Sequence, residues 1–322
     1  MRDVLWTGIY GAMDEICRRS RAAYATAGFS QRASALAVHP LLDNFVWEAL
    51  TSGWTEPAAD HLRVPVAGDL DSPARWFRRD HPADSALAAH LRAAACSDLE
   101  LADEPCTPDE TFARRLTGAC RLLAATVPEL WQHTAPFVTR VFDIPSDGMS
   151  SASLDHTGGA IFVSSVSGDA GSEADRIHLA ACLLHEAAHS KSYRIFRAFE
   201  QVRAPESPDF IDVPWWRSTG QTWAWDVDRS IVAAHVYSHL ATFYDRLSAT
   251  RPGLRRRRQQ AAFRARFLTN VLLQLPPSAL NPQWRDFIEW TASTIVPLGK
   301  LTDAGEKELS RPLSSFPLYR SG

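Results

Sequence analysis

The stretch LLHEAAH, residues 183–189, determines how the rest of the chain is interpreted. Imidazoles at positions i and i+4 of a helix share one face, about 6 Å apart, so His185 and His189 can bind one ion through two nitrogens. Glu186 leaves the helix about 100° round from His185 and can reach a metal-bound water without being a ligand. Apolar residues flank the motif, which indicates a buried helix whose polar groups need partners. We therefore predict a metal centre here.

The helix that carries this motif has recognisable start and stop signals. Ser172, with Asp175 three positions later, is typical of a capping box, and Pro205 is expected to stop the helix after about Val202. Upstream, the runs 137–144 and 160–166 are rich in valine, isoleucine and phenylalanine and predict two or three strands. A substrate could lie along the edge of the second of these strands.

Helical periodicity dominates the remaining chain. The predicted helices cover 83–101, 108–133, 223–247, 255–275 and 282–295. The predicted fold class is therefore α+β and mainly α-helical, with a zincin-like HExxH helix beside a small antiparallel sheet and helical regions on the N-terminal and C-terminal sides. We expect an N-terminal helical region, 1–136, and a metal-binding catalytic region, 137–322, which could also form one continuous domain.

Composition and charge exclude several functional classes. The 322 residues are 45% hydrophobic and 22% charged, which suits a chain with a sizeable core. The 37 acidic and 34 basic side chains give a net charge of −3, so no nucleic-acid partner is predicted. No run reaches the roughly 18 apolar residues of a membrane span, and the start lacks a secretory signal, so we expect a cytoplasmic protein without a membrane partner. Five scattered cysteines predict reduced thiols.

The residues that follow the motif narrow the choice of metalloenzyme class. An extended metzincin pattern would need a histidine six residues after His189, and that position is Ile195. A gluzincin would need a glutamate on a following helix, whereas Glu200 lies roughly 16 Å further along the same predicted helix. Neither class supplies the third ligand.

The helix predicted at 223–247 offers other candidates for the third ligand. His235 lies among small apolar residues and is the first candidate, and His239, one turn further on, is the second. A single histidine on such a face is more often a hydrogen-bonded core residue. Asp226 and Asp228, near the start of the helix, are further candidates, with capping and interaction with the helix dipole as their ordinary roles.

The sequence resembles the family of HExxH-motif peptide-modification proteins, which act in the biosynthesis of ribosomally made, post-translationally modified peptides. The matching features are the strand 159–163 (GAIFV), the helix 183–189 (LLHEAAH), the stretch 214–217 (PWWR) and a helix from Arg229 through His235 to 243–244 (FY). They cover roughly residues 140 to 250. Ser230 follows Arg229 where the family tends to have proline.

The resemblance implies an enzyme that uses iron(II) and 2-oxoglutarate to hydroxylate the β-carbon of a peptide or amino-acid side chain. It implies that His185, His189 and His235 bind the iron, which leaves three positions for a bidentate 2-oxo acid and dioxygen. The far carboxylate of the cosubstrate then needs a cation, and because lysine is scarce we expect Arg229, or else Arg217, to bind it.

Other assignments of the same residues remain open. His239 is a further candidate for contact with the cosubstrate. The partner would be a precursor peptide or an amino-acid substrate, and no oligomeric state is predicted. In a zinc metallopeptidase, Glu186 would be the general base for a metal-bound water, whereas in the hydroxylase it would orient a ligand or substrate from outside the coordination sphere. A third interpretation is a peptide-binding module whose histidines hold a structural ion.

Overall fold

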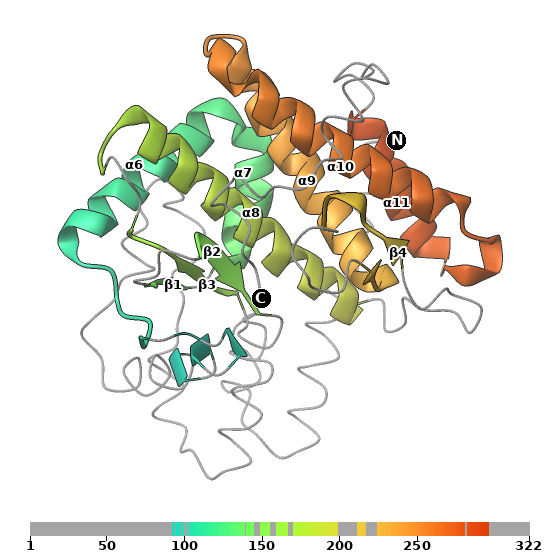
Figure 1. Ribbon diagram of the computed structural model, residues 1–322, viewed down its shortest axis with the longest axis horizontal. Coiled ribbons are helices and arrows are strands. Elements are labelled where there is room, and N and C mark those ends of the chain that lie inside the picture. The colour runs from blue at the N-terminus through green and yellow to red at the C-terminus, as the bar shows by residue number, and fades with distance from the viewer. Residues whose placement is uncertain are drawn as a thin grey trace, which may run out of the picture. The chain divides into compact units, whose positions relative to one another are not determined.

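The fold is seen in a computed structural model (Figure 1). The residues that the structure describes are 92–93, 95–96, 98–99, 101, 103–138, 140–144, 149–154, 159–166, 170–198, 211–216, 224–280 and 282–295. This part of the chain is mainly helical with a small three-stranded sheet, which agrees with the predicted α+β class. Among the helices in these ranges, none combines the length and apolar character needed to cross a bilayer.

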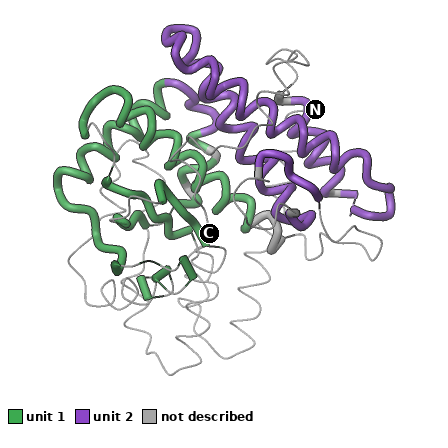
Figure 2. The backbone as a smooth tube through the Cα atoms, viewed as in Figure 1, with its two compact units in different colours: residues 1–125, 131–198, 320–322 green, residues 126–130, 199–319 purple. Residues whose placement is uncertain are grey.

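The chain divides into two compact units (Figure 2). The first comprises residues 1–125, 131–198 and 320–322, and the second comprises residues 126–130 and 199–319. The motif LLHEAAH belongs to the first unit, and the later histidines at 235 and 239 belong to the second.

The sheet of the first unit has the order β1-β3-β2. β3 (Ala160–Val163) is the central strand and all four of its residues are buried, as expected for an apolar run with neighbours on both sides. β2 (Ser151–Ser153) pairs with β3 antiparallel, but β1 (Arg140–Asp143) pairs with it parallel.

The prediction of an antiparallel sheet is therefore wrong for one of the two strand pairs. The chain reverses direction twice between β1 and β3, and β2 takes the far side of β3, so β1 and β3 run in the same direction. The expectation of a substrate along the edge of β3 is also wrong, because both edges of this strand are paired; β1 and β2 are the edge strands.

The helix α8 (Glu173–Ala198) carries the motif and packs against β2 and β3 (Figure 1). The predicted cap is confirmed, because the backbone N–H of Asp175 donates to Ser172 Oγ at 3.0 Å. The predicted end near Val202 lies outside the described residues. Leu183, Leu184 and their neighbours on α8 are buried, so the burial expected from the apolar flanks is confirmed.

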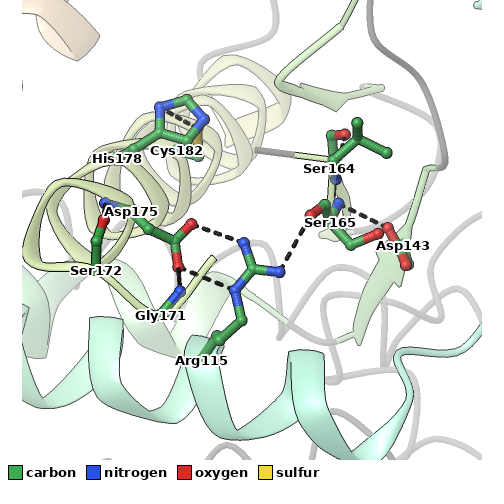
Figure 3. A network of polar contacts seen from close by, with 10 residues as sticks. Arg115, Asp143, Ser164, Ser165, Gly171, Ser172, Asp175, His178 and Cys182 are labelled. Atoms are coloured by element: carbon green, nitrogen blue, oxygen red, sulfur yellow. Dashed lines mark hydrogen bonds and ion pairs between the residues drawn. The ribbon is translucent and has the colours of Figure 1, made fainter. Parts of the chain in front are cut away.

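A polar network anchors the start of α8 (Figure 3). Arg115, on α6 (Glu110–Thr126), donates to both oxygens of Asp175 at 2.9 and 2.7 Å and to the carbonyl oxygen of Ser165 at 3.1 Å. Asp143, at the end of β1, accepts from the backbone N–H of Ser165 at 2.8 Å. These bonds connect α6, β1, the segment after β3 and the first turn of α8, and so hold α8 at a defined position along the sheet.

One helix predicted in the N-terminal part proves to be two. Residues 108–133 form α6 and then α7 (Pro128–Thr134), followed by the short helix η2 (Ala135–Phe137). Pro128 lacks the N–H that would continue the hydrogen bonding of α6, so the chain starts a new helix at that residue. Most of the helix predicted at 83–101 lies outside the described residues.

In the described part of the second unit, three long helices pack on one another. They are α9 (Val227–Ser248), α10 (Arg255–Gln274) and α11 (Pro282–Ile295), and the last two agree closely with the predicted ranges. α9 begins later than predicted because Ala224–Trp225 forms strand β5, which pairs with β4 (Ile211–Asp212). The described residues of this unit also form the short helices η4 (Pro214–Trp216), η5 (Pro252–Leu254) and η6 (Pro277–Ala279).

Candidate metal centre

The two histidines of the motif bring their outer nitrogens together on one face of α8. His185 Nε2 and His189 Nε2 lie 3.1 Å apart, and the ring planes are inclined by 58°. An ion bound at about 2.0–2.1 Å from each nitrogen would separate the two nitrogens by roughly 2.9 to 3.4 Å, depending on the coordination angle. The observed distance fits this requirement, so the structure confirms the geometric expectation from the i, i+4 spacing.

Glu186 adds a buried carboxylate to the same site. Its Oε1 lies 3.8 Å from His185 Nε2, and its side chain is only 3% exposed. One potential ligand atom from each of His185, Glu186 and His189 lies within 4.8 Å of the others. Two imidazoles and one carboxylate suit zinc, iron and other borderline divalent ions. The residues present therefore fit a transition metal, and their types alone do not select one.

Two serines of β2 hold the Glu186 carboxylate. Ser151 Oγ donates to Oε1 at 2.7 Å and Ser153 Oγ donates to Oε2 at 2.6 Å. Residues two apart in a strand point to the same face, so both hydroxyls reach the carboxylate from one side of β2. These serines were not predicted from the sequence. The Ser-Ala-Ser alternation is a signal for two hydroxyls on one face, but it does not show which residue they contact.

Further along α8, another ionisable side chain is buried. Lys191 is 1% exposed, and its burial lowers the pKa of the ammonium group to about 7, because an apolar environment disfavours the charged form. Tyr193 stacks on the His189 ring at a centroid distance of 5.8 Å. The ring thus has an aromatic contact that restricts its orientation.

The predicted third ligand, His235, lies on α9 in the second unit and is fully buried. Its ring lies 5.1 Å from that of Phe287 and 6.0 Å from that of Trp290, both on α11. His239 packs T-shaped against His235 at 4.1 Å, and its Nδ1 donates to the carbonyl oxygen of His235 at 2.9 Å. The assignment of His235 as the third ligand stays a prediction.

The remaining candidates lie at the start of α9 or outside the described residues. Asp226 is the N-cap of α9, since its Oδ1 accepts from the backbone N–H of Arg229 at 2.6 Å, so its ordinary role is confirmed. Asp228 lies in the first turn of α9 and is partly exposed. Arg229 is exposed and its guanidinium lies 4.9 Å from the Trp225 ring centroid. Arg217 is outside the described residues.

Comparison with known proteins adds no assignment to this site: no protein-family model matches the sequence, and no curated protein matches it.

Proposed function

We propose that the protein is a mononuclear non-haem iron, 2-oxoglutarate-dependent hydroxylase that acts on a side chain of a peptide or amino acid. The observation that carries the metal-dependent part is the 3.1 Å separation of His185 Nε2 and His189 Nε2 beside the buried Glu186 carboxylate. The iron and 2-oxoglutarate part is supported by the resemblance described in the sequence analysis. We also propose that α8 beside its small sheet is a zincin-like arrangement.

In this proposal the protein supplies binding, orientation and charge. His185 and His189 bind the metal through Nε2, and His235 is proposed as the third ligand. Bound iron(II) would supply the redox chemistry that couples 2-oxoglutarate decarboxylation to C–H hydroxylation. Arg229 is proposed to bind the far carboxylate of the cosubstrate, because a guanidinium can form two parallel hydrogen bonds to a carboxylate. The substrate is proposed to be a precursor peptide or an amino acid.

The environment of Glu186 favours the hydroxylase over a zinc peptidase. A peptidase needs this carboxylate to take a proton from a metal-bound water and pass it on. Here each carboxylate oxygen already accepts a serine hydroxyl, so one acceptor site on each oxygen is occupied and the carboxylate is held in one orientation. A carboxylate held in one orientation by two donors suits a role in orienting a ligand or substrate, and this supports the hydroxylase.

The decisive test is a turnover assay on anaerobically purified protein reconstituted with iron(II). Succinate should form from 2-oxoglutarate only when iron and oxygen are both present, and the His189→Ala variant should form none. Glu186→Gln should retain part of the activity. Cleavage of unstructured peptides by the zinc-loaded protein, abolished in Glu186→Gln while zinc stays bound, would instead establish the peptidase.

A further inference from the structure

The serines that hold Glu186 belong to a strand whose own position is fixed by the sheet. Ser151 and Ser153 lie opposite Val163 and Ile161 of β3, and the backbone N–H of Ser164 donates to the carbonyl oxygen of Ser150 at 2.9 Å. The hydroxyls are therefore presented by a paired strand. Since α8 packs on the same strand, the carboxylate and its two donors come from elements that are already in contact.

We propose that Ser151 and Ser153 are positioning residues that fix the orientation of Glu186 at the metal centre. Hydrogen bonds to a carboxylate are short and strong, and here there is one on each oxygen, at 2.7 and 2.6 Å. Two hydrogen bonds to different oxygens restrict rotation of the carboxylate about the last C–C bond of the side chain. A single hydrogen bond would restrict this rotation less. Glu186 is thereby a fixed acceptor near His185 Nε2, at 3.8 Å.

The fixed orientation has a chemical consequence. A carboxylate oxygen has two lone pairs, so after the serine bonds each oxygen of Glu186 keeps one acceptor site. The serines therefore determine in which direction the remaining acceptor sites of Glu186 point, and so which group at the metal can donate a hydrogen bond to them. Without them, the buried side chain is free to adopt other rotamers, and the negative charge next to the histidines moves with it.

Cobalt(II), used as a spectroscopic probe, tests the positioning role without any turnover. The variants to compare are Ser151→Ala/Ser153→Ala, Ser151→Thr/Ser153→Thr and the matched control Ser150→Ala, which removes a hydroxyl from the neighbouring residue. The double alanine variant should bind cobalt(II) about tenfold more weakly, with a shifted visible absorption band, because supporting residues of metal sites typically have effects of 10- to 100-fold. The threonine variant keeps both hydroxyls and should restore affinity and spectrum.

The result that would overturn the proposal is a double alanine variant with the same cobalt(II) affinity and spectrum as Ser150→Ala. If the double variant does not fold, the single variants Ser151→Ala and Ser153→Ala are measured in the same way. Each removes one of the two bonds, so each should shift the spectrum, and unchanged spectra in both would again overturn the proposal.

A second readout rests on the proposed function. In the hydroxylase, a wrongly oriented Glu186 should lower the ratio of hydroxylated product to succinate about tenfold while the KM for 2-oxoglutarate stays unchanged. A purely structural role of the serines would leave this ratio unchanged, and that result would contradict the proposal. If the wild-type protein forms no succinate, the proposed function fails, and the cobalt(II) measurement alone decides the role of the serines.

Discussion

Two helices of this protein carry histidines four residues apart, yet the two pairs have different surroundings. On α8, His185 and His189 bring their Nε2 atoms to 3.1 Å from each other beside a carboxylate, and the His185 side chain is 18% exposed. On α9, His235 and His239 are buried, their rings pack T-shaped, and His239 Nδ1 donates to the carbonyl oxygen of His235.

The contrast shows that the i, i+4 spacing alone does not determine the surroundings of a histidine pair. The spacing places two rings on one face of a helix, but the neighbouring elements decide how the rings are used. Beside α8 stands β2, which supplies serine hydroxyls to Glu186. Beside α9 stands α11, which supplies the aromatic rings of Phe287 and Trp290. The bond from His239 Nδ1 to the backbone does not exclude this ring as a ligand, because metal-bound histidines commonly donate their other nitrogen to a carbonyl oxygen. We nevertheless expect His235, the first candidate from the sequence, to be the ligand that α9 contributes.

The strongest test of this contrast replaces one histidine of each pair. His189→Ala removes half of the convergent pair and should weaken metal binding by more than about 100-fold, beyond the effect of changes outside the coordination sphere. His239→Ala should leave the metal affinity unchanged and lower only the free energy of unfolding. Calorimetric titration with zinc(II) or iron(II) measures the first quantity and chemical denaturation the second. Equal losses of affinity in both variants would show that the two pairs do not differ in function.

The substitution His235→Ala sharpens the contrast within α9. If His235 is the third ligand, its removal should lower metal affinity at least tenfold, whereas a core role would affect stability alone. We expect the loss of affinity, together with a change in the visible spectrum of the cobalt(II)-loaded protein. Unchanged affinity and spectrum would assign His235 to the core of the second unit.

Local features of the sequence correctly predicted the convergence of two histidines and two helix caps. The convergence of His185 and His189 follows from helix geometry, and the caps Ser172 and Asp226 act within three residues of their partners. The parallel pairing of β1 with β3 was missed, because a strand's partner depends on the path of the chain and the strand's own pattern does not reveal it.

The serine contacts to Glu186 were missed for a related reason. Ser151 and Ser153 precede Glu186 by 35 and 33 residues, so only the packing of α8 on β2 brings them together. The division of the predicted helix 108–133 at Pro128 was missed for a different reason, because its cause is a local one. The apolar periodicity continues from α6 into α7 and masked the proline signal.

The buried Lys191 side chain should make the free energy of unfolding depend on pH. Its pKa is about 7 in the folded protein, against 10.5 as the ordinary value. Between these pH values the unfolded chain binds a proton that the folded protein lacks, so the free energy of unfolding should increase as pH rises.

Lys191→Met should therefore stabilise the metal-free protein most at pH 7 and below. A tenfold change in proton affinity corresponds to about 1.4 kcal/mol, so the gain should reach several kcal/mol and shrink towards pH 10. Urea denaturation of the wild-type protein and of Lys191→Met, in the presence of a chelator and at several pH values, measures the difference in the free energy of unfolding. A difference between the two proteins that does not vary with pH would show that the amine keeps its ordinary pKa.

The smallest predicted effect concerns the start of α9. Asp226→Ala removes the carboxylate that accepts from the backbone N–H of Arg229 at 2.6 Å, and loss of such a cap costs about 1 kcal/mol. Ser172→Ala is the matched change at α8, where the hydroxyl accepts from Asp175. Denaturation curves should show a similar small loss for both, and metal affinity should stay at the wild-type value. A loss of metal affinity in Asp226→Ala, together with unchanged affinity in His235→Ala, would instead identify Asp226 as the third ligand.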